Sequence, residues 1–374
     1  MNGEGHAGAR DGGAQSPTLA SALARHHLPA LDGLRAIAVG GVMLFHFGVA
    51  WFSVAIAGVG LFFVLSGFLI THLLLQERAA TGTISLGKFY LRRALRIFPA
   101  YYVFLAVSFA VMTANGAEVS TRLIATTLTY STNYVQAFGL DRQTLVSHSW
   151  SLAIEEQFYL LWPLGLLLLL RGRRRPLMAI AVALVGIVAW RTRLFTTGRG
   201  DYIYYAFDTR ADYLLVGCAL ALLSRREDFL QRINVVTRHA WFPLVTIALV
   251  GLSFRRPPFQ GYIVTVGHTL VAMLLAVLLV QCMVLREHRG WRWLEWPAIR
   301  YLGRISYPLY LYHQLAPTLL RPLEEAGVRL AIRLPLEFAV SLALASLSWR
   351  VVERPFLALK RHAAVTPPQP STVH

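Results

Sequence analysis

LDGLRAIAVGGVMLFHF, the stretch from Leu31 to Phe47, has the apolarity of a membrane-spanning helix yet contains Arg35 and His46. The spacing of eleven residues from Arg35 to His46 places them on one helix face, roughly 16 Å apart along the axis. Because charge inside a bilayer is costly, ionisable residues that stay there mark candidate sites. A plainer interpretation, an interfacial arginine and a histidine bonded to a neighbouring helix, suits Arg35 alone equally well. The aligned pair favours function.

The composition of the chain is that of a membrane protein. Of its 374 residues, 56% are hydrophobic and only 15% are charged, which is too apolar for a soluble protein of this size. The net charge of +17 raises the possibility of a nucleic-acid partner. However, the arginines fall between apolar segments and are not gathered in one basic domain, a pattern typical of membrane topology. No nucleic-acid partner is therefore expected.

The chain is expected to form one membrane domain between two tails. Residues 1–28 are rich in Gly, Ala, Ser and His and show no cleavable signal, so they are expected to be a disordered cytoplasmic tail, as are residues 357–374. The domain between them covers residues 29–356. Cys218 and Cys282 lie in apolar stretches without metal-ligand spacing, which predicts buried packing residues and no metal site.

Apolar segments of about 20 residues predict an all-α polytopic bundle of about ten transmembrane helices. The expected spans are 31–50, 55–75, 97–114, 150–170, 177–195, 210–224, 241–254, 262–285, 301–320 and 334–352. With the N-terminus in the cytoplasm, the inner connections hold roughly twice as many Lys and Arg residues as the outer ones. This bias predicts a multi-pass protein of the cell membrane, surrounded by lipid, with both termini in the cytoplasm.

This topology gives each polar residue an expected depth. Arg35 enters at the cytoplasmic end of the first span, and Arg93 and Arg96, three apart on one helix face, precede the third span on the same side. His46 lies near the outer end of the first span. Glu155 lies about one and a half turns below the outer surface, which is the expected level of His46.

Two further spans contribute polar residues to the outer half. Arg210 and Asp212 begin the sixth span, and Ser306, Tyr310 and His313 fall on one face of the ninth at spacings of four and three. Plainer interpretations exist for the arginines, which often anchor topology, for glutamates at helix starts, for tyrosines in an aromatic belt, and for His148 and Trp150 as interfacial residues. They do not explain why an inner group is all arginine and an outer group combines histidine with carboxylates.

This separation favours a particular chemistry. Arginines bind phosphate oxygens in a bidentate manner, and a histidine beside a carboxylate suits general-base catalysis. A donor with phosphates at one end and a reactive carbonyl at the other would span both groups. An acyl coenzyme A has that form.

Seven motifs together resemble one known family, the membrane acyltransferase 3 family. In its order, they are LDGLRAIAVGGVMLFHF, FFVLSGFLIT, RRALRIFPAYY, HSWSLAIEEQFYLLWP, TRADYLLVGCALA, ISYPLYLYH and VERPF. The resemblance runs from Leu31 to Phe356. It implies O-acylation of a hydroxyl, commonly on a cell-surface carbohydrate or glycolipid, with acyl-CoA as the cytoplasmic donor.

The resemblance also implies roles for residues of this sequence. Arg35 and His46 match the Arg and His pair of the first helix that the family needs for activity, and Arg93 and Arg96 match the RxxR motif associated with the CoA nucleotide. The residues that match the motif of the fourth span are Trp150, Ser151, Glu155, Gln157 and Tyr159. Glu155 matches better than its neighbour Glu156. The acyl group expected is acetyl.

The mechanism expected from these residues has two halves. Arg93, Arg96 and Arg35 hold the nucleotide end of acyl-CoA, and the thioester reaches His46 near the outer leaflet. His46 then removes the proton of the acceptor hydroxyl or first accepts the acyl group itself, and Glu155 and Arg35 assist it. The acceptor contacts are expected from Trp150, Ser151, Gln157, Tyr159, Arg210, Asp212, Ser306, Tyr310 and His313.

Several points stay open at this stage. The chain ends shortly after the last motif, so a stand-alone transferase is expected, with a partner protein or a homo-oligomer possible. The acceptor is a saccharide, a glycolipid or a small metabolite such as a macrolide. A transporter would use the same intramembrane His, Glu and Arg residues, although no matching pair of interrupted helices supports one. A membrane scaffold is the third alternative.

Overall fold

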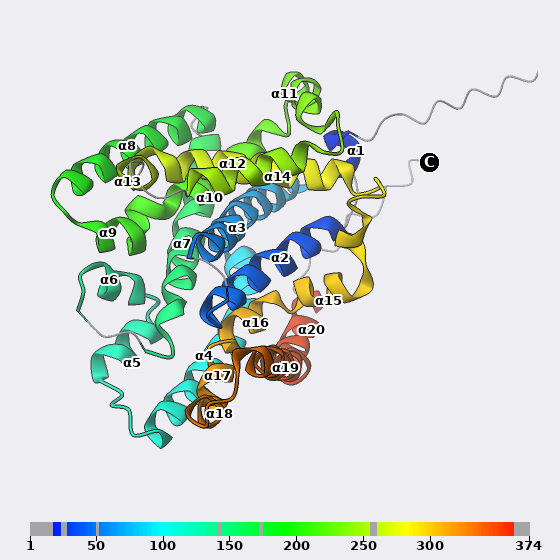
Figure 1. Cartoon of the computed structure of the whole chain (residues 1–374). Coiled ribbons are helices and arrows are strands. Elements are labelled where there is room, and N and C mark those ends of the chain that lie inside the picture. Colours follow the sequence, from blue (N-terminus) through cyan, green and yellow to red (C-terminus); the bar gives the residue numbers. More distant parts are fainter. Residues whose placement is uncertain are drawn as a thin grey trace, which may run out of the picture.

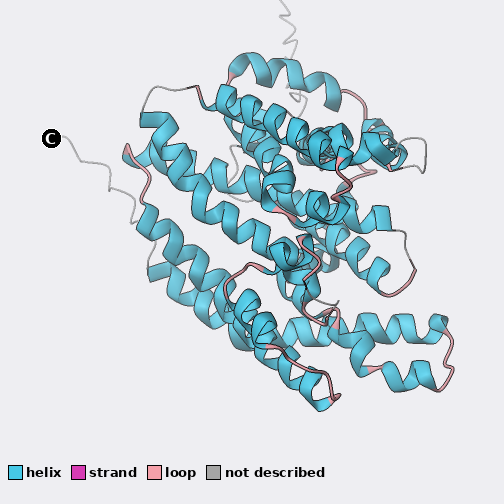
Figure 2. Ribbon diagram, turned by 90° about the vertical axis from the view of Figure 1, so that its left-hand side faces the viewer, coloured by secondary structure: helices cyan, strands magenta, loops and turns pink. Residues whose placement is uncertain are grey.

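The chain folds into a bundle of helices, as the sequence predicts. The computed structural model describes residues 18–23, 28–49, 52–140, 144–171, 175–254 and 260–362, and within these ranges it contains helices and no strand (Figures 1 and 2). The prediction of an all-α fold is confirmed.

Among the described residues, nine helices of 12 residues or more make up the body of the bundle. They are α2 (Pro29–His46), α3 (Phe52–Thr81), α4 (Leu86–Ala114), α7 (Trp150–Arg171), α8 (Pro176–Thr196), α10 (Phe207–Leu223), α12 (Phe242–Ser253), α14 (His268–Leu285) and α19 (Leu330–Ser348). Shorter helices are α1 (Leu19–Leu23), α5 (Thr121–Leu128), α6 (Thr132–Ala137), α9 (Gly200–Tyr205), α11 (Glu227–Ile233), α13 (Gln260–Tyr262), α15 (Pro297–Arg304), α16 (Ser306–Tyr312), α17 (Leu315–Leu319), α18 (Arg321–Glu325) and α20 (Arg354–His362). Single-turn 3₁₀ segments cover Ser147–Ser149, Asn234–Thr237 and Arg292–Glu295, and π-helical segments cover Ile263–Gly267 and Trp349–Glu353.

The count of about ten spans is not confirmed. Among the described residues, six helices are long and apolar enough to cross a membrane, or seven if α11 and α12, which meet at a bend of 87°, form one broken span. The other expected spans are helical but fall short for identifiable reasons. Asp32, Arg35 and His46 reduce the apolarity of α2, α10 has 17 residues, and the expected ninth span is divided into α15, α16 and α17.

Helix α3 forms the centre of the bundle. Its apolar window is 78% buried, whereas those of α8 and of the segment containing α19 are only 17% buried, so these two helices lie at the perimeter. Helix α3 packs against α2 and α10, and Figure 1 shows it between them. Gly67 and Gly217 lie where α3 and α10 meet, and neither position has room for a Cβ. Such small residues let membrane helices approach closely.

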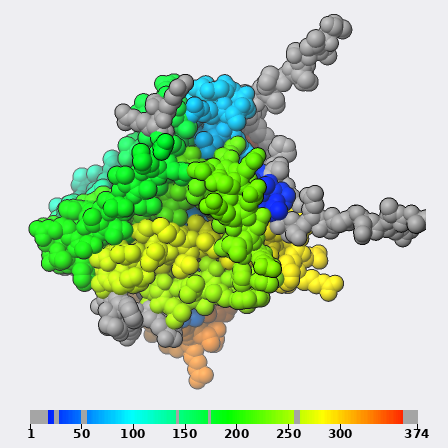
Figure 3. Space-filling model, turned by 90° about the horizontal axis from the view of Figure 1, so that it is seen from above, coloured from blue at the N-terminus to red at the C-terminus, as the bar shows by residue number. Residues whose placement is uncertain are grey.

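Both expected tails are partly ordered. In the N-terminal tail, Leu19–Leu23 form α1, whose Leu19 and Ala22 are buried against α14 and α11. In Figure 3 this helix appears as a blue patch beside the yellow-green segment that follows α10. Helix α20 continues the C-terminal segment as far as His362. Disorder therefore does not extend over these stretches, because apolar side chains of α1 pack on the bundle. Residues 1–17, 24–27 and 363–374 lie outside the described residues.

Candidate active site

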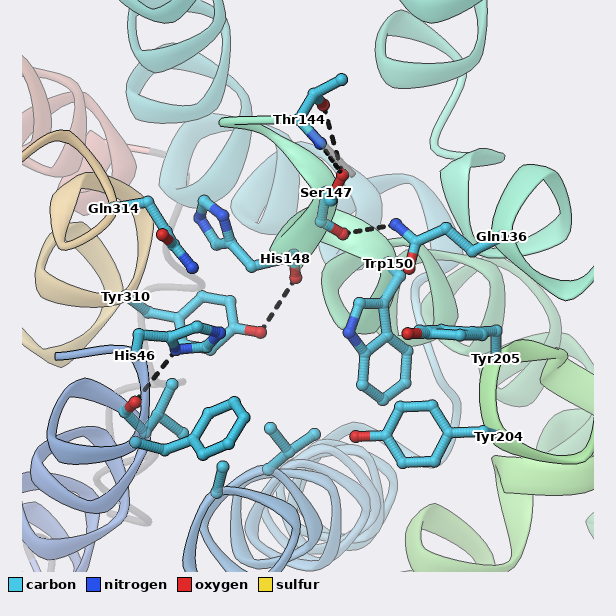
Figure 4. A pocket seen from close by; sticks show the side chains of 14 residues that line it. His46, Gln136, Thr144, Ser147, His148, Trp150, Tyr204, Tyr205, Tyr310 and Gln314 are labelled. Carbon is cyan, nitrogen blue, oxygen red and sulfur yellow. Dashed lines mark hydrogen bonds between the residues drawn. The ribbon is translucent and has the colours of Figure 1, made fainter. Parts of the chain in front are cut away.

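A cavity of about 290 Å³ opens where α2, α3, α9 and α16 meet the start of α7 (Figure 4). Its polar and aromatic lining includes His46, Gln136, His148, Trp150, Tyr204 and Tyr310. Because α2 ends at His46 and α7 begins at Trp150, both residues are presented at helix ends, where their side chains reach the cavity. The cavity is large enough for a few heavy atoms of a ligand and is lined by a potential base.

His46 has a fixed orientation and tautomer. Its Nδ1 lies 3.0 Å from the Val42 carbonyl oxygen and 3.1 Å from Nε2 of His313. Nδ1 of His313 lies 2.7 Å from the Tyr310 carbonyl oxygen, so this nitrogen donates and Nε2 of His313 accepts. His46 therefore donates from Nδ1, and its Nε2 carries the lone pair. Among the described residues, no partner occupies that Nε2.

His148 is the third histidine of the group. Its ring centroid lies 4.9 Å from that of His313, and its Nε2 lies 3.1 Å from the Leu311 carbonyl oxygen. The side chain is buried and lines the cavity, so the interpretation of His148 as an interfacial residue is wrong. Contact with α16, which lies more than 150 residues away in the sequence, draws it inward.

Ser151 and Tyr310 join the start of α7 to α16. The Tyr310 hydroxyl donates to the His148 carbonyl oxygen at 2.9 Å. The Ser151 hydroxyl lies 2.6 Å from the Tyr310 hydroxyl oxygen and donates to that oxygen. Both residues were expected to contact the acceptor. Tyr310 lines the cavity, and Ser151 lies directly behind it. His313, another expected acceptor contact, bonds to His46 and does not line the cavity.

The arginines expected at the inner end of the bundle are gathered in one cluster. Arg35 lies 3.3 Å from Asp32 and experiences repulsion from Arg93 and Arg96. Arg93 lies over the ring of Tyr159, 5.1 Å from its centroid. The cluster lies outside the cavity, which none of the three guanidinium groups lines. Three neighbouring cations form a site suited to a polyanion.

Glu155 lies beside this arginine cluster. Its carboxyl group lies near the hydroxyls of Ser66 and Tyr159, and Arg93 and Arg35 attract it. Ser66 and Tyr159 also bond directly to each other. The neighbours of Glu155 are therefore on α3 and α4, and its assistance to His46 stays a prediction. The residue that orients His46 is His313.

Asp212 forms a buried ion pair instead of facing a ligand. Its carboxylate lies 2.9 Å from Arg191, both side chains are fully buried, and it accepts a bond of 2.7 Å from Thr269. The expectation of a substrate contact is not supported for this residue. Arg191, which the sequence indicates only as a cation of an outer connection, is the partner that α8 supplies.

Arg210 does not line the cavity but contacts Tyr204, which does. Its guanidinium lies 2.9 Å from Nδ1 of His268 and stacks over Tyr204 and Tyr213, with 5.3 Å to the centroid of the Tyr204 ring. Nε and Nη2 of Arg210 are buried without hydrogen-bond partners among the described residues. Arg210 therefore supports Tyr204, which does line the cavity.

Two other expected acceptor contacts lie away from the cavity. Gln157 donates to the Tyr130 carbonyl oxygen and to Asn133, both at 2.9 Å, and so holds α6 against α7. Ser306 is buried at the start of α16 but does not line the cavity. Of the nine residues expected to bind the acceptor, Trp150 and Tyr310 line the cavity directly.

A comparison with protein families decides what kind of protein carries this site. The model of the acyltransferase 3 family, described as an acyltransferase domain, matches residues 28–349. The chain belongs to this family. The match includes every helix that lines the cavity and all three arginines of the cluster.

Two relatives of this acyltransferase-family chain are named as peptidoglycan O-acetyltransferases. It is 29% identical over 350 residues to the peptidoglycan O-acetyltransferase OatA of Listeria monocytogenes, covering 88% of this chain and 56% of that protein. It is 31% identical over 358 residues to the putative peptidoglycan O-acetyltransferase YrhL of Bacillus subtilis, covering 88% and 55%. The chain thus spans a little over half the length of these relatives. No solved structure matches it significantly.

Some residues of this acyltransferase-family site could not be found from the sequence. Gln136, Thr144, Ser147, Tyr204 and Gln314 line the cavity although no pattern singled them out. All but Gln314, which lies in the expected ninth span, come from short helices and connections that membrane-span analysis treats as loops. The sequence signal nearest to these residues is the HSW motif, whose His148 and Trp150 line the cavity although the sequence also allows them as interfacial residues.

Proposed function

We propose that this chain is a membrane O-acyltransferase that moves an acetyl group from a cytoplasmic acyl-CoA to a hydroxyl of a saccharide acceptor. The observation that carries the proposal is the lone pair of His46 Nε2, held at a cavity by the bond between His46 and His313. The names of the relatives favour a cell-wall saccharide over a glycolipid or a small metabolite.

In the proposed reaction His46 acts as the general base. Its Nε2 takes the proton of the acceptor hydroxyl while that oxygen attacks the thioester carbonyl carbon. The C–S bond then breaks, and the CoA thiolate leaves with the proton from His46. The bond from Nδ1 to His313 supports this role because it holds the ring in one tautomer and stabilises the imidazolium that forms. In an alternative first step, Nε2 accepts the acyl group itself.

The arginine cluster is the proposed donor site. Arg35, Arg93 and Arg96 carry three positive charges close together, which suits the phosphates of the CoA nucleotide. The roughly 16 Å between Arg35 and His46 along α2 is a distance that an extended pantetheine arm covers. We place the cluster at the cytoplasmic face of the cell membrane, both termini in the cytoplasm, and His46 toward the outer leaflet. This placement rests on the distribution of Lys and Arg between the spans.

The proposal is tested with purified protein in detergent or nanodiscs. Radiolabelled acetyl-CoA is mixed with muropeptides, with chitooligosaccharides or with a macrolide, and the labelled product is identified by mass. Acetyl transfer to a saccharide is the expected result, and transfer to the macrolide alone would identify a small-metabolite enzyme. If no acceptor is acetylated and reconstituted vesicles instead accumulate a solute, the chain is a transporter and the proposal is wrong.

A further inference from the structure

The indole of Trp150 has an unusual environment for a buried tryptophan. The side chain is only 7% exposed, and its ring is packed between Tyr204, Tyr205 and Phe63 at centroid distances of 5.0, 5.3 and 6.4 Å. Two aromatic neighbours on α9 and one on α3 therefore hold the indole in one orientation. Figure 4 shows its nitrogen on the edge of the ring that faces Tyr310 and His46.

The Trp150 N–H group has no hydrogen-bond partner among the described residues. Two other buried tryptophans do have one. Trp162 donates to the Thr71 hydroxyl at 2.8 Å, and Trp291 donates to the Ala240 carbonyl oxygen at 2.7 Å. Nε1 of Trp150 is open to the cavity, so a ligand atom bound there can accept the hydrogen bond that an indole N–H in a largely buried side chain normally makes.

Across the cavity from this donor lies the base. His46 and Trp150 both line the cavity, on α2 and at the start of α7. Attack of a hydroxyl on a thioester turns the carbonyl oxygen into an anion, which needs a preorganised donor in a site shielded from water. Among the described residues, no arginine or lysine lines the cavity to serve that purpose.

We propose that the Trp150 indole N–H is the oxyanion donor of the transfer reaction, a role that rests on the proposed function. As the acceptor oxygen bonds to the thioester carbon, the C=O π electrons move to the carbonyl oxygen, which accepts the hydrogen bond from Nε1. His46 holds the acceptor proton meanwhile. When the C=O bond forms again, the C–S bond breaks and the thiolate leaves with that proton. Trp150 neither gains nor loses a proton.

The test replaces Trp150 with 3-benzothienylalanine, which keeps the shape of the indole but has sulfur in place of the N–H. We expect kcat to fall about 10²- to 10³-fold, with the KM for acetyl-CoA within about 3-fold of the wild type. The same replacement at Trp241, which is 56% exposed, is the matched control and should leave kcat unchanged. Trp150→Phe, which also lacks the N–H, should lose at least as much.

Three outcomes would overturn the proposal. The first is a benzothienyl variant that keeps wild-type kcat while Trp150→Phe loses it, since packing alone would then explain the tryptophan. The second is a rise in KM with unchanged kcat, which indicates a ground-state contact. The third is absence of transfer by the wild type with every acceptor, which removes the proposed function and this role together. If the wild type transfers acetyl groups, the proposed function holds, and the activity of the benzothienyl variant then tests the role of Trp150 separately.

Discussion

His46 and His313 come from opposite parts of the chain, yet their ring nitrogens lie 3.1 Å apart, with Nδ1 of His46 donating to Nε2 of His313. His313 is fully buried, and its own Nδ1 is held by the Tyr310 carbonyl oxygen. The Tyr310 carbonyl, acting through His313, and the Val42 carbonyl, which lies 3.0 Å from Nδ1 of His46, together determine which nitrogen of His46 faces the cavity. A carboxylate does this work in the serine-protease triad.

The first prediction concerns this positioning role of His313. His313→Phe should lower kcat roughly 10²-fold while the KM for acetyl-CoA stays near its wild-type value, because His46 loses one of the two acceptors of its Nδ1–H and the partner that stabilises its cation. His313→Gln, whose amide oxygen can accept the same bond, should recover part of the rate. Steady-state kinetics of both variants measure the effect. Equal rates for the Phe variant and the wild type would show that Val42 alone orients His46.

The second prediction is that His46→Ala abolishes acetyl transfer. The substitution removes the base from a cavity that the neighbouring helices already form, so folding and acetyl-CoA binding should persist. A loss of at least about 10²-fold is expected for a general base. His239→Ala, at an exposed position away from the cavity, is the control. Full activity of the His46 variant would transfer the base role to His148 or His313.

The third prediction concerns donor binding. Arg93→Ala and Arg96→Ala should each weaken acetyl-CoA binding roughly 10- to 100-fold, the usual range for hydrogen bonds to charged groups. Lys should restore only part of the affinity because it lacks the bidentate fork. Arg92→Ala is a matched control, since Arg92 instead lies 3.1 Å from Glu77. Calorimetry with CoA measures the affinities, and an unchanged value in the double variant would reduce both arginines to topology anchors.

The fourth prediction separates structure from substrate binding at Asp212. Asp212→Ala leaves Arg191 as an unpaired buried charge, which costs about 3–5 kcal/mol in known cases. We expect a clear fall in thermal stability, with little change in KM for the protein that remains folded. Replacing both partners by leucine should recover much of the stability. The exposed Asp201→Ala is the control. A rise in acceptor KM at unchanged melting temperature would restore Asp212 as a binding residue.

The fifth prediction is sidedness. In sealed inside-out vesicles, acetyl-CoA added outside should be used without permeabilisation, because the proposed topology turns the arginine cluster toward the medium. The acceptor should be acetylated only when it is trapped in the lumen. Thin-layer or mass analysis of the labelled product measures both arms. Equal acetylation of acceptor added beside the CoA would show a transferase that works entirely on the cytoplasmic face, as modification of an antibiotic would require.

The sequence by itself determined the class of the protein, the position of its helices and the family. Apolar runs and a helical period are local properties, so every expected span is helical, even where its length or continuity is insufficient to cross a membrane. The same local geometry correctly placed Arg35 and His46 on one helix and drew attention to Arg93 and Arg96. The motifs, read in order, led to the family that residues 28–349 match.

Only the tertiary structure decided which side chains meet. A sequence gives the angle and depth of a residue on its own helix, but not which neighbouring helix that face meets. For this reason the neighbours of Glu155 on α3 and α4 could not be predicted, and Asp212 was assigned to a ligand although α8 supplies Arg191. His313 became the partner of His46 because close packing brings α16 beside α2. Contacts between distant segments are set by the packing of whole helices, and no single span contains that information.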